Sequence, residues 1–112
     1  MPITNPDYTN LDHEAMAKAI GLKVKHMPML IESFVEESNP ILNKLQSAVE
    51  SKDYETIKAT AHSIKGSAGN LRFSELAEMA REVEHASENQ DASFEYSAYN
   101  DAMSKAILTI KL

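Results

Sequence analysis

Apolar residues recur at intervals of three and four positions through most of this 112-residue chain. This spacing places them on one face of an α-helix, which turns once in about 3.6 residues. The chain has only three glycines, and no segment alternates apolar and polar residues as a half-buried strand would. The sequence therefore predicts an all-α fold.

Breaks in this pattern divide the chain into five helices. A short first helix is expected to begin at a capping box formed by Thr9 and Asp12, and to end at Ile20 before Gly21. Four longer helices follow, each with an apolar stripe that we expect to be buried. The stripes are Met27, Leu30, Ile31, Phe34, Val35, Ile41, Leu42, Leu45 and Val49; Ile57, Ala61, Ile64, Ala68 and Leu71; Leu76, Ala80 and Val83; and Tyr99, Ala102, Met103, Ala106, Ile107 and Ile110.

A proline interrupts the second helix. Pro40 lacks the N–H that would continue the helical hydrogen bonds, so we expect a kink or a local break between Ser38 and Pro40. The helix is expected to end in a turn at residues 51–53.

Capping signals separate the later helices. Asp53 is a natural N-cap for the third helix, and Ser74 for the fourth, with Phe73 before it as a hydrophobic staple. Residues 88–93 are polar and turn-like, so the last helix is expected over residues 94–111.

Long amphipathic helices on short loops predict an up-and-down antiparallel four-helix bundle with a short additional N-terminal helix. The bundle is expected to cover residues 9–112, and residues 1–8 are expected to form a flexible N-terminal arm.

The composition excludes several classes of protein. A formal net charge of −6 argues against a general nucleic-acid-binding protein. The absence of cysteine excludes disulfide frameworks and thiolate chemistry. No apolar run approaches the roughly 20 residues of a membrane span. Residues 1–11 lack the basic and apolar segments of a signal peptide. We therefore expect a free-standing cytoplasmic domain that binds neither nucleic acid nor a membrane.

One face of the third helix combines a histidine with lysines and glycines. At about 100° per residue, Lys58, Lys65, Gly66 and Gly69 all lie within about 60° of His62, away from the core stripe. A glycine inside a helix costs about 1 kcal/mol relative to alanine, but it bares the backbone, so that another molecule can approach the imidazole. An accessible imidazole beside two ammonium groups is suited to taking up a phosphoryl group.

Residues 62–67, HSIKGS, resemble the signature of histidine-phosphotransfer (HPt) domains, which is His-x-x-Lys-Gly followed by small residues. The similarity extends through most of the chain, because residues 34–38 with Pro40 and Leu42 are similar to the family's second helix. Further positions that match the family are Asp53, Ala61, Asn70, Leu71, Leu76, Ala77 and Glu84. The resemblance implies a carrier protein in two-component signal transduction, with no kinase or nucleotide-binding domain of its own.

The resemblance also implies roles for the residues on this face. His62 would accept a phosphoryl group on Nε2 from a receiver-domain aspartate and pass it to another receiver. Lys65 would stabilise the phosphate, and Gly66 would leave room for the partner. Further residues expected to contact the partner are Ser67, Gly69, Lys58 and Arg72. At Arg72 the chain departs from the family, since many members have glycine there.

The implied partners are the receiver domains of hybrid histidine kinases and response regulators. The resemblance implies a monomer that binds no cofactor or metal, with Mg²⁺ held by the partner receiver domain.

Two other functions remain open. A non-phosphorylated helical docking module would bind receiver domains or other proteins with His62 as a mere contact, and it would tolerate His62→Gln. A metal-binding bundle is suggested by the spacing of Glu82 and His85, which di-iron bundles use. No other histidine follows a glutamate at that spacing, and we interpret His13, His26 and His85 as surface residues.

Overall fold

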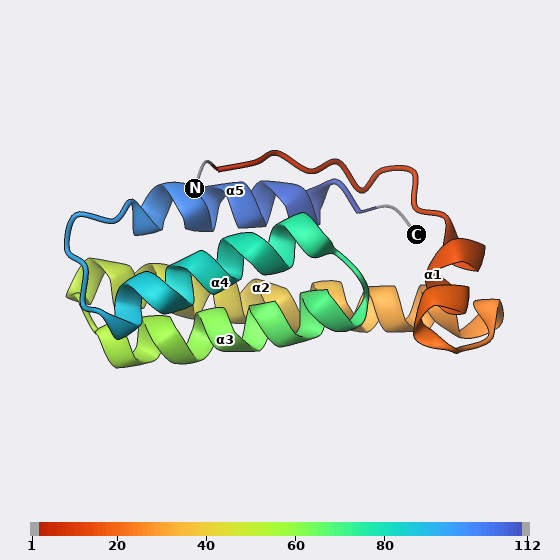
Figure 1. The fold of residues 1–112 in the computed structure, drawn as a ribbon, viewed down its shortest axis with the longest axis horizontal. Coiled ribbons are helices and arrows are strands. Elements are labelled where there is room, and N and C mark those ends of the chain that lie inside the picture. Colours follow the sequence, from red (N-terminus) through yellow and green to blue (C-terminus); the bar gives the residue numbers. More distant parts are fainter. Residues whose placement is uncertain (1–2, 111–112) are drawn as a thin grey trace.

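The computed structural model describes residues 3–110, which form helices joined by short connections (Figure 1). The elements are α1 (His13–Ile20), the 3₁₀ helix η1 (Val24–His26), α2 (Met27–Ser51), α3 (Tyr54–Asn70), α4 (Ser74–Glu88) and α5 (Tyr96–Leu108). Residues 3–110 contain no strand, so the all-α prediction is confirmed for this part of the chain.

The four longer helices lie side by side, and each runs opposite to the one before it (Figure 1). α3 packs against α2 and α4, and α5 packs against the same two helices. The short connections favour this arrangement, because a turn of a few residues returns the chain beside the helix that it has just left. α1 and η1 pack against α2 and against each other at one end of the molecule.

The core is formed mainly by the apolar stripes that the sequence predicts, to which Met79, Ala86 and Tyr96 are added. Every predicted residue of the third and fourth helices is buried. In α2, and in the last predicted stripe, which runs past the end of α5, most residues are buried, while those at the edges are half-buried against the core. These edge residues are Leu30, Val35, Ile41, Val49 and Ile110.

Phe73 joins the α3–α4 connection to the core. Its side chain is 2 % exposed, and its ring centroid lies 4.5 Å from that of Tyr8 and 5.3 Å from that of Phe34. We expect Phe73→Ala to lower the free energy of unfolding by about 3–5 kcal/mol, because the truncation leaves a cavity where three rings meet. Denaturant unfolding followed by far-UV circular dichroism measures this loss. The half-buried Phe94, replaced by alanine, is the control and should lose less; equal losses would contradict the prediction.

α1 begins later than the capping box predicts. Asp12 itself is the N-cap, and its carboxylate accepts a hydrogen bond from the N–H of Ala15 at 3.0 Å. Thr9 donates its N–H and its hydroxyl to Asp7 instead, so the capping box of Thr9 and Asp12 is wrong. The end of the helix is confirmed, with Gly21 in the left-handed region at φ +76°.

The N-cap of α3 is confirmed and that of α4 is wrong by one residue. The carboxylate of Asp53 accepts a hydrogen bond from the N–H of Thr56 at 3.2 Å. Ser74 is the first residue of α4 and not its cap, because Phe73 occupies the N-cap position. The N–H of Phe73 donates to the carbonyl of Ala68 at 2.9 Å, which closes α3. Because Phe73 is itself the cap of α4, it is not the hydrophobic staple expected before the cap.

α2 is continuous from Met27 to Ser51, so the local break predicted between Ser38 and Pro40 is wrong. Pro40 faces solvent while Ser38 is buried. On the solvent side, water can bind the carbonyl that the missing N–H leaves free, so a helix tolerates a proline there more easily. A kink within the continuous helix stays a prediction.

Residues 3–8 and the segment after α5 lie against the bundle in the described part of the chain. α5 falls inside the predicted range of 94–111, although Phe94 belongs to the preceding loop and Lys111 lies outside the described residues. Residues 3–8 run alongside α5 (Figure 1), and the N–H of Tyr8 donates to the hydroxyl of Thr109 at 2.8 Å. The flexibility of residues 1–8 stays a prediction, and residues 1–2 are not described.

Candidate functional site

His62 lies in the middle of α3 with its imidazole turned toward solvent, and its side chain is 67 % exposed. One ring nitrogen is engaged, because Nδ1 lies 2.7 Å from Oε2 of Glu84. A carboxylate can only accept this hydrogen bond, so in the neutral ring Nδ1 carries the proton and Nε2 keeps its lone pair. Within residues 3–110 no hydrogen bond to Nε2 occupies that lone pair. The imidazole therefore presents a nucleophilic nitrogen to solvent.

Glu84 also binds the neighbouring lysine. The ammonium of Lys65 donates to Oε1 of Glu84 at 2.6 Å, and the Glu84 side chain is only 14 % exposed. Burial raises the pKa of Glu84, but the hydrogen bonds from Lys65 and His62 together lower it by more, so that its pKa lies below the ordinary value. The carboxylate is therefore ionised at neutral pH and holds the Lys65 ammonium and the Nδ1 side of the His62 ring in place.

The antiparallel α3–α4 pair explains why Glu84 reaches this site. His62 and Glu84 are each eleven residues from Phe73, in the connection between the two helices. Residues equally far from a tight connection lie at the same level in a helical hairpin. Glu84 is one of the positions at which the sequence matches the family, but the resemblance assigns no role to it. This symmetry about the turn is the signal that could have identified it.

The two glycines of this face are open to solvent and not packed against another helix. Gly66 is exposed and Gly69 half-buried. A Cβ atom added to either residue would meet nothing within 4 Å. Neither glycine is therefore required for packing within the chain, and the space beside His62 is free for another molecule.

Lys58 and Ser67 lie near His62 with different surroundings. Lys58 and His62 line an open pocket of about 420 Å³ together with Glu55, Ala59 and Glu84. The hydroxyl of Ser67 donates to the carbonyl of Ser63 one turn earlier at 2.6 Å, so it is engaged within α3. Their contacts with a partner stay predictions.

Arg72 lies away from this cluster. It follows His62 by ten residues, which is about 15 Å along a helix axis, and its Nη2 donates to the carbonyl of Ala19 at 3.3 Å. Its φ of +66° is in the left-handed region that closes α3. Glycine would adopt that conformation without strain. Arg72 instead binds the end of α1.

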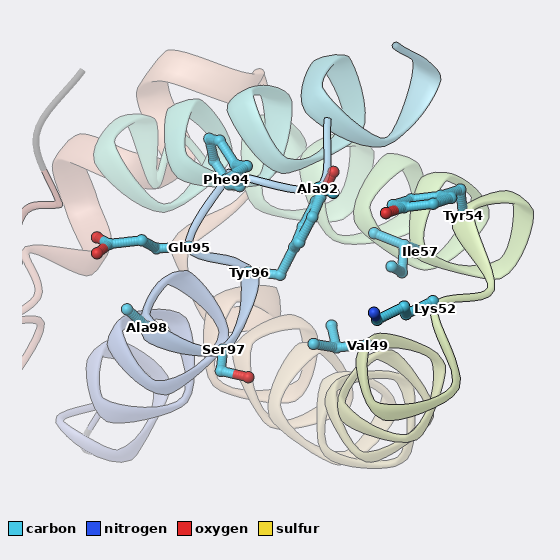
Figure 2. A pocket seen from close by; sticks show the side chains of 10 residues that line it. All are labelled: Val49, Lys52, Tyr54, Ile57, Ala92, Phe94, Glu95, Tyr96, Ser97 and Ala98. Atoms are coloured by element: carbon cyan, nitrogen blue, oxygen red, sulfur yellow. The ribbon is translucent and has the colours of Figure 1, made fainter. Parts of the chain in front are cut away.

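A second cavity has no connection with His62. It has a volume of about 430 Å³, and Tyr54 and Tyr96 face each other across it with ring centroids 6.2 Å apart (Figure 2). It lies between the α2–α3 turn and the start of α5, and none of its lining residues belongs to the His62 pocket.

The structure offers no metal cluster and no membrane-spanning helix within its described part. No group of three or more His, Cys, Asp and Glu side chains in residues 3–110 is placed to hold a metal ion, so Glu82 and His85 do not form part of one. In the same range, no helix combines the length and apolar character needed to cross a bilayer.

Comparisons with known proteins identify the family of this chain. The Hpt domain model matches residues 29–107, which include His62, Lys65 and Glu84. The crystal structure of histidine-containing phosphotransfer protein B from Pseudomonas aeruginosa PAO1 is similar, with a TM-score of 0.76 and 26 % sequence identity. The similarity covers 88 % of this chain and 84 % of that one. No protein with a curated description matches. The chain belongs to the Hpt domain family, and its role is histidine phosphotransfer in a phosphorelay.

Proposed function

We propose that Nε2 of His62 accepts a phosphoryl group from the aspartate of one receiver domain and passes it to the aspartate of another. The four longer helices would serve as an up-and-down antiparallel bundle that holds this imidazole at the surface. One observation carries the proposal: Nδ1 of the exposed His62 ring lies 2.7 Å from the carboxylate of Glu84. This contact places the proton of the neutral ring on Nδ1 and leaves the lone pair of Nε2 available.

The transfer needs few groups on this chain. The Nε2 lone pair attacks the phosphorus of the aspartyl phosphate, the P–N bond forms, and the bond from phosphorus to the aspartate oxygen breaks. No proton has to leave Nε2, since it bears none. In the second transfer an aspartate oxygen attacks the phosphorus and the electrons of the P–N bond return to the ring. Mg²⁺ held by the receiver would neutralise charge on the phosphoryl oxygens.

Lys65 would stabilise the phosphate as a point charge. We expect Lys65→Ala to slow phosphoryl uptake by about 10- to 100-fold, which corresponds to the loss of one hydrogen bond to a charged group. Rapid-quench measurement of transfer from a phosphorylated receiver checks this. Lys105→Ala is the matched control, because Lys105 is an exposed lysine of α5 that does not line the His62 pocket. An unchanged rate in Lys65→Ala would exclude a role in phosphate binding.

The proposed partners are the receiver domains of hybrid histidine kinases and of response regulators, bound in the cytoplasm by a monomer. They would cover Gly66, Gly69 and Lys58 around His62, and extend toward Ser67 and Arg72. Large apolar side chains exposed near the start of α2 would add contact area at the C-terminal end of α3, beside Arg72. These side chains are Leu22, Val24 and Met29.

Intact mass measurement tests the proposal directly. After the protein is mixed with a phosphorylated receiver and Mg²⁺, its mass should increase by one acid-labile phosphoryl group. Fragmentation that preserves phosphohistidine should locate the group on His62 and not on His13, His26 or His85. Failure of every active donor would instead favour the non-phosphorylated docking module.

A further inference from the structure

Glu84 contacts both groups that the proposed function uses. One carboxylate oxygen accepts from Nδ1 of His62 at 2.7 Å and the other accepts from Lys65 at 2.6 Å. The remaining charged residues that line the His62 pocket are Glu55 and Lys58, both from α3. α2, the other helix packed against α3, contributes no residue to this pocket. Within residues 3–110, Glu84 is therefore the one acidic group bonded to the ring.

Phosphorylation on Nε2 would change how this hydrogen bond affects the protonation of the ring. A phosphoryl group on Nε2 leaves Nδ1 either protonated or with a bare lone pair. Without its proton, Nδ1 of His62 would direct that lone pair at an ionised carboxylate oxygen 2.7 Å away, and the two would repel each other. With the proton in place the contact remains a charge-assisted hydrogen bond. The geometry thus favours the protonated ring.

We propose that Glu84 sets the lability of the phosphohistidine by keeping the proton on Nδ1 while Nε2 carries the phosphoryl group. This inference rests on His62 being the acceptor. When an oxygen of water or of a receiver aspartate attacks the phosphorus, the P–Nε2 bond breaks and its electron pair stays on Nε2. Because Nδ1 already bears a proton, the departing ring is a neutral imidazole and not an imidazolate anion. Glu84 is a positioning residue, since it acts through the ring and not on the phosphorus.

Two features of the site suit Glu84 to this role. The carboxylate has to remain ionised, and the hydrogen bonds that lower its pKa ensure this despite its burial. It also has to stay beside the ring, and its second oxygen is anchored by Lys65. Lys65 would then lie between two anions, the carboxylate and the phosphoryl group, and would limit the repulsion between them.

The pH profile of phosphoryl loss tests the proposal. Wild type and Glu84→Gln are phosphorylated with phosphoramidate, a small donor that needs no receiver, and freed of the donor. Loss of the phosphoryl group is then followed by intact mass at a series of pH values. Because loss requires the protonated ring, Glu84 should extend rapid loss to higher pH. The midpoint for Glu84→Gln should lie lower by about one pH unit, with up to about tenfold slower loss between the two midpoints.

Controls separate this effect from a structural one. Glu88→Gln removes an exposed carboxylate one turn further along α4, and its profile should match that of wild type. In denaturant the profiles of wild type and Glu84→Gln should coincide, because the folded contact is lost. Should Glu84→Gln fold poorly, nitrogen NMR of the phosphorylated wild type still reports whether Nδ1 bears its proton at a pH where the unfolded phosphoprotein has lost it.

The outcomes distinguish this inference from the function on which it rests. Equal midpoints in two folded variants phosphorylated on His62, or an unprotonated Nδ1 in the folded wild type, would overturn the role of Glu84 and leave the acceptor standing. Failure of phosphoramidate to modify His62 in the folded wild type would overturn the acceptor itself.

Discussion

Replacing His62 by glutamine should reduce phosphoryl uptake from every receiver to the background level. Glutamine retains a polar side chain of similar reach and favours a helix almost as well as alanine, but it has no ring nitrogen to attack phosphorus. The side chain is 67 % exposed, so the substitution leaves the core unchanged and the protein folded. Intact mass after incubation with phosphorylated receivers measures the loss.

His85→Gln is the matched control for this experiment. His85 is also an exposed histidine in a helix, and Asn89 is its hydrogen-bonding neighbour one turn later. This variant should accept one phosphoryl group, as wild type does. Uptake by His62→Gln at the wild-type level would mean that another residue is the acceptor.

The same variant separates the relay from a docking module. If the protein only bound receivers, the His62→Gln variant would bind them as well as wild type does and would support the same cellular response. A relay would keep receiver binding in this variant while transfer to the second receiver is lost. Binding and transfer therefore have to be measured on the same preparation.

Local patterns allowed most of the fold to be predicted. The stripe from Ile57 to Leu71 is buried as expected, because spacing by three and four needs only the geometry of one helix. Asp53 caps α3 for an equally local reason, since its carboxylate reaches an N–H three residues later. Thr9 offered a similar signal, but Asp7 bonds its hydroxyl and its N–H. Competing partners of this kind make helix ends less predictable than helix centres.

Features that depend on two elements could not be read from spacing alone. η1 has no apolar stripe and no buried residue, so no periodic signal marks it. Glu84 acquires its role only when α4 folds back along α3, which brings it 2.7 Å from a ring 22 residues earlier. The His62 face is different, because Lys58, Lys65, Gly66 and Gly69 all come from the same helix. The sequence could therefore predict the exposed histidine and the open space beside it, but not the carboxylate that contacts its ring.

Gly66→Leu should make the free protein more stable and the relay much slower. Gly66 lies inside α3, where leucine is better by about 0.5–1 kcal/mol in helix propensity, and an added Cβ meets nothing within 4 Å. A helical leucine points back over the preceding turn, and four residues before Gly66 is His62. Its side chain would thus occupy the space from which a receiver approaches Nε2. Displacing the reacting groups by about 1 Å can cost about 10²-fold in rate, and we expect a loss of at least that size.

Denaturant unfolding and rapid-quench transfer, measured on one preparation, check the two halves of this prediction. Gly66→Ala should gain similar stability but lose less transfer, because its side chain stops at Cβ. Ser47→Leu places the same leucine on an exposed position of α2 and should leave the transfer rate unchanged. If Gly66→Leu lost both stability and transfer, the glycine would serve the fold of this chain. If Gly66→Leu gained stability and lost transfer, the bare backbone beside His62 would serve the approach of a partner, since the packing of this chain does not require it.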